Sequence, residues 1–363
     1  MMKLTTPVEF PKAAVEISYG DRIMVLGSCF ADNVGKRLKD RGFELCLNPF
    51  GTLYNPSSIE RSIARLDSGE HFVESDCVQI GSGSTKWGSF HHHTLMARET
   101  PEEFLANANE SLDRAAEFWR TCNKVIVTFG TSWCFRHIGF GGKVSLPQGD
   151  ETPRAGDIFE RGEAGSNEGF VVSNCLKRDA REFIREFIPA ETTAEIVRRI
   201  VEEHPDKDFI FTVSPIRHFK DGAHGNQLSK ASLLIGLDEA LKAVSGQPTA
   251  PTLTSGEQVS GQATASTPTS GKQVSGQPTA GQTGSAKALQ DCEKPRCDYF
   301  PAYEIMLDEL RDYRFYAEDM IHPSEQAVNY IFERFIGWAL PESEKDEFLR
   351  REKVFRQSQH IPR

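Results

Sequence analysis

The chain has 363 residues, enough for one large or two ordinary domains with a buried core. It carries 42 Lys and Arg against 52 Asp and Glu, which gives a net charge of -10. This balance, without a basic run, provides no general attraction for nucleic acid or anionic lipid, so we expect no nucleic-acid and no membrane partner.

Short apolar runs alternate with helical patterns along the chain. Strands are predicted over residues 22–27, 43–47, 124–129, 208–213 and about 298–303. Helices are predicted over residues 30–41, 56–66, 101–120, 178–203, 226–243 and 326–340. This alternation predicts right-handed crossovers and an α/β fold, with a parallel sheet covered by helices on both faces.

In such a sheet, ligands bind at the carboxyl ends of the strands. Four turns follow predicted strands and are therefore candidate sites. They are Gly27-Ser28-Cys29, Asn48-Pro49-Phe50-Gly51, Gly130-Thr131-Ser132-Trp133 and Ser214-Pro215-Ile216-Arg217-His218.

The first of these turns contains two potential nucleophiles. Ser28 and Cys29 lie between the first strand and the first helix. A helix N-terminus presents backbone N–H groups and positive potential, which favour a thiolate or an oxyanion. Either residue is a candidate for attack on an acyl carbon, although a Gly-Ser turn of this kind also occurs as an ordinary helix cap.

Near the end of the chain, Asp319 and His322 have the spacing of an acid and a base that act together. A carboxylate three residues before a histidine can accept the Nδ1 proton and leave Nε2 free to act as a general base. The alternative is structural: Asp319 and Ser324 cap the last helix, Pro323 lies in its first turn and His322 is a surface residue.

Residues 245–290 form a separate tract rich in Gly, Ser, Thr, Pro and Gln, with a repeat that begins at Ser245, Ser260 and Ser275. Few of its side chains can be buried, so we predict a disordered insertion. The remainder is interpreted as one domain made of residues 1–244 and 291–340, followed by a polar tail over residues 341–363.

The combination of these motifs resembles the GSCFA-domain family, within the SGNH or GDSL-like hydrolases. The matching segments are Gly27-Ser28-Cys29-Phe30-Ala31 with Asn33, Asn48-Pro49-Phe50-Gly51, Asn174-Cys175, Ser214-Pro215 with Arg217-His218, and Asn226-Gln227-Leu228-Ser229-Lys230-Ala231. The resemblance implies a three-layer α/β/α sandwich around a central parallel sheet of about five strands. It also implies hydrolysis or transfer of acyl esters without a metal or other cofactor.

Two departures from the superfamily pattern affect the catalytic assignment. A gapless match of Gly-Asp-Ser places Cys29 at the nucleophile position and Ser28 at the aspartate position, so the nucleophile stays open between them. The third block, Gly-x-Asn in the superfamily, reads Gly130-Thr131-Ser132 here. The oxyanion would then be held by Gly51 N–H, the N–H of the nucleophile, Ser132 and Asn174.

Three other positions are candidate substrate-binding residues. His92, within His91-His92-His93, is interpreted as part of a substrate wall, with a metal site as the less favoured alternative because no acidic or thiol partner has suitable spacing. His218 follows a strand and is a rival base to His322. Arg217 can pair with an anionic substrate group or with a structural carboxylate.

The expected function is hydrolysis of a small acyl ester, such as an O-acylated carbohydrate, by Ser28 or Cys29 with His322 and Asp319. An acyltransferase that uses the same residues is one alternative, and a non-catalytic module that binds a glycan or a partner is the other. Eight cysteines without a C-x-x-C pair predict reduced thiols. The chain shows no signal peptide and no membrane-spanning window, so we expect a cytoplasmic protein.

Overall fold

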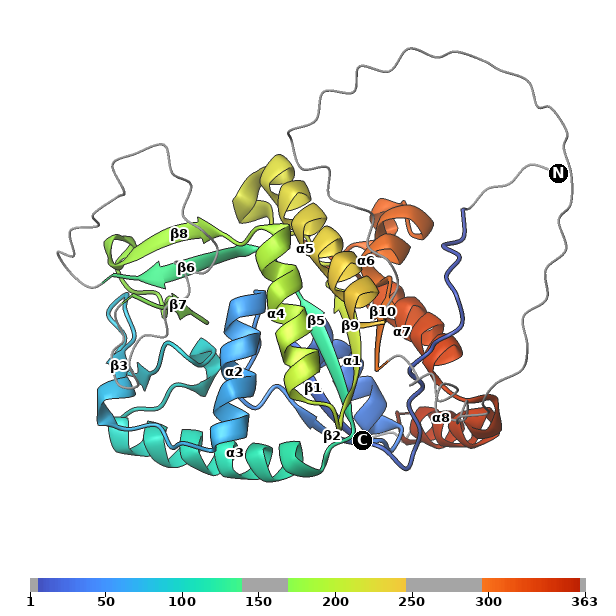
Figure 1. The fold of residues 1–363 in the computed structure, drawn as a ribbon, viewed down its shortest axis with the longest axis horizontal. Helices are drawn as coiled ribbons and strands as arrows, with labels where there is room; N and C mark the ends of the chain where they lie inside the picture. The colour runs from blue at the N-terminus through green and yellow to red at the C-terminus, as the bar shows by residue number, and fades with distance from the viewer. Residues whose placement is uncertain (1–5, 139–168, 246–295, 360–363) are drawn as a thin grey trace, which may run out of the picture.

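The computed structural model describes residues 6–138, 169–245 and 296–359 (Figure 1). Its centre is a five-stranded parallel sheet with the order β10-β9-β5-β1-β2. The strands are β1 (Arg22–Gly27), β2 (Glu44–Leu47), β5 (Lys124–Phe129), β9 (Asp208–Val213) and β10 (Cys297–Phe300). The predicted α/β class and the strand number are therefore confirmed.

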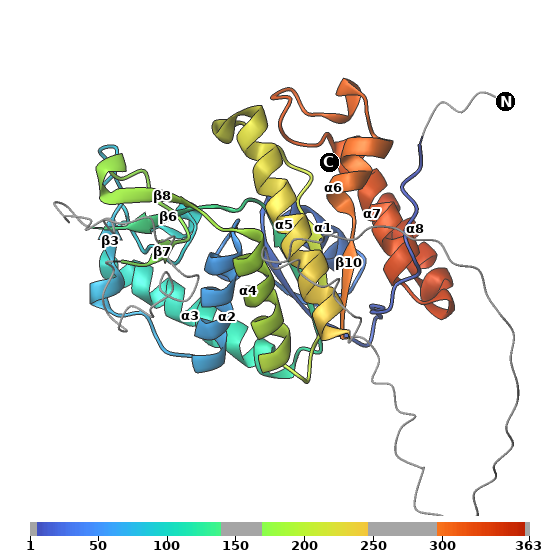
Figure 2. The same cartoon turned by 45° about the horizontal axis from the view of Figure 1, so that its top comes forward.

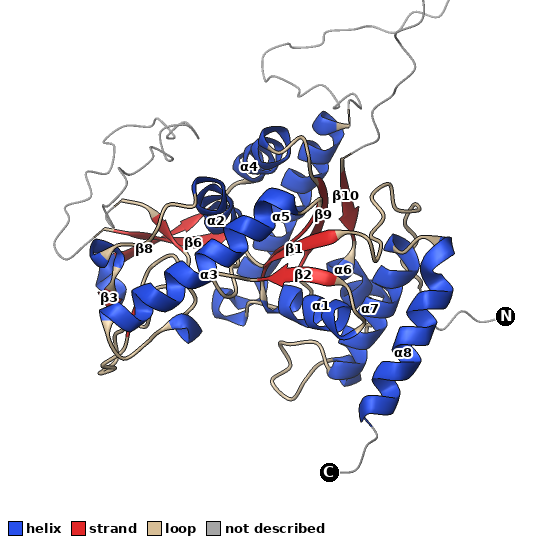
Figure 3. Ribbon diagram, turned by 90° about the horizontal axis from the view of Figure 1, so that it is seen from below, coloured by secondary structure: helices blue, strands red, loops and turns tan. Residues whose placement is uncertain are grey.

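Helices cover both faces of this sheet, and Figure 3 shows α1 and α7 on the side opposite α2 and α4. The helices are α1 (Cys29–Asp40), α2 (Pro56–Ser68), α3 (Pro101–Thr121), α4 (Ala190–Glu203), α5 (Gly222–Val244), α6 (Ala302–Glu304), α7 (Glu325–Ala339) and α8 (Lys345–Gln359). Side chains alternate along β1, so Met24 and Leu26 pack with α2 to α5, whereas Ile23 and Val25 pack with α1 and α7. The result is a three-layer α/β/α arrangement with two buried cores.

Two small antiparallel sheets lie beside the main one (Figure 2). One pairs β3 (Val78–Gln79) with β4 (Trp87–Gly88), and the other has the order β7-β6-β8, from β6 (Trp133–His137), β7 (Val171–Val172) and β8 (Phe183–Phe187). Short 3₁₀ or π turns occupy Glu74–Asp76, Thr94–Met96, Ala180–Glu182, Phe219–Asp221, Ile305–Glu309, Tyr313–Phe315 and Glu342–Glu344.

The helix predicted over residues 178–203 is wrong in its first part. Residues 183–187 form β8, and α4 begins only at Ala190. The spacing of Phe183, Ile184 and Phe187 fits a helical period, but these residues pair with β6, and Pro189 separates strand from helix.

The structure bears differently on the predicted insertion and on the predicted tail. The tract predicted as an insertion, residues 245–290, lies outside the described residues except for Ser245. Within the segment interpreted as a polar tail, residues 345–359 form α8, whose Glu352 pairs with Arg41. Among the described residues, no helix has the length and apolar character that a membrane crossing requires.

Candidate functional site

Most of the candidate residues gather at the carboxyl edge of the main sheet, where β1, β5 and β9 end. Ser28 N–H donates to the carbonyl of Thr128 at 3.1 Å, which joins the turn after β1 to the end of β5. The Lys230 ammonium donates to the carbonyls of Gly130 at 2.6 Å and Ser214 at 2.7 Å, which joins the turns after β5 and β9. The turn after β2 joins them, because the Gly27 N–H donates to Asn48 Oδ1 at 2.8 Å, so all four predicted turns meet at this edge.

Gly27 is required at the end of β1 for two reasons. Its φ of +137° is unfavourable for other residues, and a Cβ there would lie 2.3 Å from the Thr128 carbonyl oxygen. The close approach of β1 and β5 at this point places the next two residues directly over the edge of the sheet. The chain then enters α1 at Cys29.

Ser28 and Cys29 differ in their surroundings. Ser28 is 1% exposed, and its Oγ caps α1 by accepting the Phe30 N–H at 3.3 Å. Cys29 is partly exposed. Burial raises the pKa of its thiol to about 11, while the N–H groups of Cys29 and Phe30 and the charge of Lys230 favour the thiolate. The thiol therefore lies at the N-terminus of α1 and within electrostatic reach of a buried lysine.

Asp319 and His322 form the predicted pair. His322 Nδ1 lies 2.6 Å from Asp319 Oδ2, and Asp319 Oδ1 accepts the backbone N–H groups of Ile321 and His322 at 2.9 Å. The backbone and side-chain hydrogen bonds of His322 hold the pKa of Asp319 at about 2, so this carboxyl is ionised at neutral pH. Ser324, not Asp319, caps α7, so the structural alternative explains only part of the motif.

The loop that carries His322 contacts the turn after β9. Arg217 N–H donates to the Ile321 carbonyl at 3.3 Å, and the charge of His322 acts on His218. Burial lowers the pKa of His218 to about 3, and Lys230 and His322 add to this effect. A ring with so low a pKa is neutral near pH 7 but accepts a proton only weakly, which makes His218 a poor general base. The Arg217 side chain lies over the Phe219 ring at 4.4 Å.

Lys230 is the functional candidate that the sequence analysis missed. It is 1% exposed, and burial lowers its pKa to about 7, against the opposing charges of Cys29 and Asp221. The signal was present in the sequence, because Lys230 shares a helical face with the buried residues Asn226 and Leu233. A lysine at such a core position is unusual unless it has specific partners.

Two of the predicted oxyanion donors have other partners. Gly51 N–H donates to the Asn48 carbonyl at 2.8 Å. Ser132 is fully buried and donates its hydroxyl to the Ser229 carbonyl at 3.0 Å, so it is directed toward α5. These two groups are therefore not free for a substrate in this structure.

Asn174 follows β7, the edge strand of the small sheet β7-β6-β8. Its Oδ1 accepts the Thr94 hydroxyl at 3.0 Å and the Leu176 N–H at 2.8 Å. Among the described residues, Asn174 forms no hydrogen bond with the nucleophile turn. We assign it a role in tying the Thr94 loop to that region.

The three consecutive histidines are buried to different extents. His92 is 1% exposed, contacts Phe50, Phe72 and Phe104, and pairs with the Ser89 hydroxyl at 2.7 Å. Burial lowers its pKa to about 3. His92 therefore belongs to an aromatic core and does not line a surface that a substrate can reach. Within the described ranges, no three His, Cys, Asp or Glu side chains form a group that could hold a metal ion.

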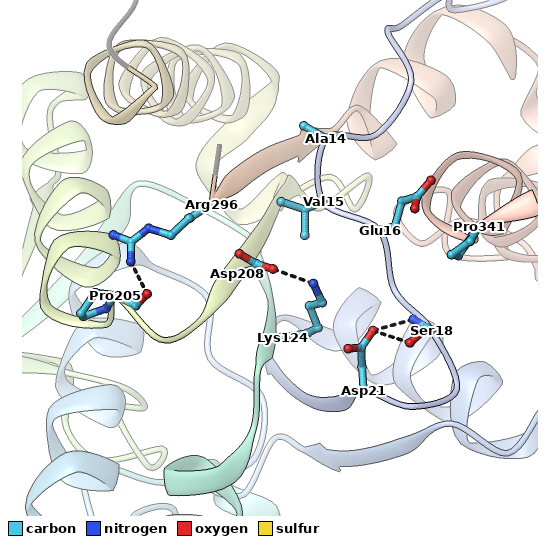
Figure 4. A pocket seen from close by; sticks show the side chains of 10 residues that line it. All are labelled: Ala14, Val15, Glu16, Ser18, Asp21, Lys124, Pro205, Asp208, Arg296 and Pro341. Atoms are coloured by element: carbon cyan, nitrogen blue, oxygen red, sulfur yellow. Dashed lines mark hydrogen bonds and ion pairs between the residues drawn. The ribbon is translucent and has the colours of Figure 1, made fainter. Parts of the chain in front are cut away.

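A hollow of about 660 Å³ lies at the opposite edge of the sheet (Figure 4). It is lined by Lys124 and Asp208, the first residues of β5 and β9, which pair at 2.6 Å, and by Arg296 before β10. None of the predicted site residues lines it. Because ligands of parallel sheets bind at the carboxyl edge, we place the candidate site there and not in this hollow.

Residues 22–247 and 285–335 match the model of the GSCFA family. These ranges include the nucleophile turn, Lys230 and the Asp319–His322 pair. No curated protein and no solved structure matches the chain.

Proposed function

We propose that this chain, which belongs to the GSCFA family, hydrolyses small acyl esters by the mechanism of the SGNH-like hydrolases. The Asp319–His322 pair carries the proposal. Its geometry at 2.6 Å gives an imidazole whose Nδ1 proton faces an ionised carboxylate and whose Nε2 can accept a proton. The His322 side chain is 50% exposed, so a substrate can approach it.

The reaction would begin at the start of α1. His322 Nε2 takes the proton of the nucleophile, which attacks the carbonyl carbon of the ester. The negative charge on the carbonyl oxygen is stabilised by the Cys29 N–H and the positive potential at the start of α1. Collapse of the intermediate releases the alcohol, which receives the proton from His322, and water then hydrolyses the acyl-enzyme.

The greater burial of Ser28 favours Cys29 as the nucleophile. The Ser28 hydroxyl is enclosed and caps the helix, whereas Cys29 retains exposed surface and lies near the charge of Lys230. In the described part of the chain, neither side chain is hydrogen-bonded to His322. Such contacts commonly shorten only when substrate binds.

The test is hydrolysis of p-nitrophenyl acetate by the wild type and by Ser28→Ala, Cys29→Ala and His322→Ala. We expect His322→Ala and Cys29→Ala to reduce kcat to the background rate, and Ser28→Ala to retain measurable activity. Iodoacetamide should alkylate Cys29 in the wild type, and the alkylated protein should no longer react with the ester.

The chain provides matched controls for both residues. His71 pairs with Asp113 at 2.7 Å and is similarly exposed, and burial raises the thiol pKa of Cys46 to about 11, as for Cys29. His71→Ala and Cys46→Ala should leave kcat unchanged. A wild type without activity above that of His322→Ala would contradict the proposal and favour a module that binds without catalysis.

A further inference from the structure

His218 has a buried ring nitrogen without a partner. Its Nε2 forms no hydrogen bond within the parts of the chain that the structure describes. Buried polar atoms are nearly always paired, and an unpaired one is unfavourable. At the ligand-binding edge of a parallel sheet, such an atom indicates a group that is paired when a ligand is present.

This nitrogen lies over the turn after β5. A Cβ placed on Gly130 would be 3.2 Å from His218 Nε2 and 3.1 Å from Tyr54 Cδ1. The absence of a side chain at Gly130 thus leaves room for the imidazole. Gly130 is two residues beyond Thr128, whose carbonyl accepts the Ser28 N–H, so the imidazole lies at the same edge of the sheet as the nucleophile turn.

Several contacts hold the imidazole in this position. The backbone N–H of His218 donates to Asn226 Oδ1 at 2.9 Å, which fixes the backbone that carries the ring, and the ring packs edge-on against Tyr54 with centroids 5.9 Å apart. Its burial and the nearby Lys230 favour the neutral form, in which only one ring nitrogen carries a hydrogen. A neutral imidazole with that hydrogen on Nε2 is a hydrogen-bond donor that does not readily lose its proton.

We propose that His218 Nε2–H donates a hydrogen bond to the oxyanion formed when the nucleophile turn attacks an ester. It would replace the side-chain amide of the superfamily's third block, a position that Ser132 occupies in sequence but directs toward α5. This inference rests on the proposed function and adds a catalytic residue to it.

In the step concerned, the sulfur or oxygen of the nucleophile forms a bond to the carbonyl carbon. The π electron pair of the carbonyl moves to its oxygen, and the proton of the nucleophile goes to His322 Nε2. His218 keeps its own proton throughout and only shares it in a hydrogen bond. The oxyanion would thus lie between the His218 ring and the Cys29 N–H at the start of α1.

Two amide variants distinguish a donor from a base. Gln places its amide nitrogen as many bonds from Cβ as His Nε2, whereas Asn places it near the position of Nδ1. We expect His218→Asn and His218→Leu to lower kcat for p-nitrophenyl acetate by about 10²–10³-fold with little change in KM, as for loss of one oxyanion donor. His218→Gln should restore most of this loss and keep the shape of the wild-type pH–rate profile.

Circular dichroism and thermal unfolding of each variant show whether it is folded, and His71→Gln and His71→Leu are the matched controls. An Asn variant with wild-type kcat would overturn the inference. A Gln variant as impaired as the Leu variant would also overturn it, because a residue that must accept a proton would then be required. If the wild type hydrolyses no ester, both the inference and the proposed function fail; if only the His218 effects are missing, the inference alone fails.

Discussion

Asn48 accepts the Gly27 N–H through Oδ1 at 2.8 Å, and this bond fixes the turn that carries the candidate nucleophiles. The same amide donates to Asp32 Oδ1 at 2.7 Å, so Asn48 connects the end of β1 to the first turn of α1. Asn48 also has a left-handed φ of 41°, a conformation that Asn tolerates better than most residues. Its side chain and its backbone conformation therefore serve the same turn.

Replacement of Asn48 should destabilise the fold. Asn48→Ala leaves the Gly27 N–H without its partner, and we expect a loss of about 1–3 kcal/mol in the free energy of unfolding. Asn48→Asp keeps the acceptor but places a second carboxylate beside Asp32, so it should not restore stability at neutral pH. Chemical denaturation of the three proteins measures this, and an Ala variant as stable as the wild type would contradict it.

Gly27 should tolerate no side chain. Gly27→Ala places Cβ at 2.3 Å from the Thr128 carbonyl oxygen in a backbone conformation unfavourable for Ala, and we expect a loss of at least about 2 kcal/mol. Gly337 in α7 is the matched control, because a Cβ there has no neighbour within 4 Å. Gly337→Ala should raise stability by about 0.5–1 kcal/mol. Thermal unfolding compares the two, and similar midpoints would refute the prediction.

The main sheet was predictable from sequence because its strands are nearly continuous apolar runs. Residues 22–27, 124–129 and 208–213 were assigned with the bounds that the structure has. In contrast, β8 has charged and aromatic residues in a helix-like order, and only its pairing with β6 makes it a strand. Local patterns do not contain such long-range pairing.

The candidate site was predictable in part. The spacing of Asp319 and His322 predicted their pairing, because three residues suffice for a local hydrogen bond. The role of Ser132 could not be judged in this way, since its orientation depends on contact with Ser229 in α5, far away in sequence. Burial of Lys230 likewise depends on how α5 packs over β5 and β9.

Lys230 should make stability depend on pH. Its pKa of about 7 in the fold is below the ordinary 10.5, so between these values the unfolded chain binds more protons than the folded one. The contribution of this group to the free energy of unfolding therefore rises with pH from about 7 to 10.5 and is lost as pH falls toward 7. Buried thiols with pKa values raised to about 11 act in the opposite direction above pH 9, so the useful window is pH 7–9.

The measurement is the difference in unfolding free energy between wild type and Lys230→Met at several pH values in this window. We expect the difference to increase with pH, with a slope approaching about 1.4 kcal/mol per pH unit. Only the slope is used, so a uniform loss of stability caused by the unpaired Gly130 and Ser214 carbonyls does not affect the result. Parallel curves would show that Lys230 keeps an ordinary pKa in the fold.

Asp319→Asn should show whether His322 needs Asp319 to orient it, because this variant keeps the His322 imidazole and changes only its partner. Asn has the size of Asp but no charge and can present an N–H to the imidazole, which favours the tautomer whose Nε2 already carries a proton. We expect kcat for p-nitrophenyl acetate to fall by about 10³–10⁴-fold with little change in KM. The matched control is Asp113→Asn, which alters the equivalent partner of His71 and should leave kcat unchanged. Equal rates for Asp319→Asn and the wild type would mean that the carboxylate only shapes the loop before α7, and His322 would then lose its assignment as an oriented base.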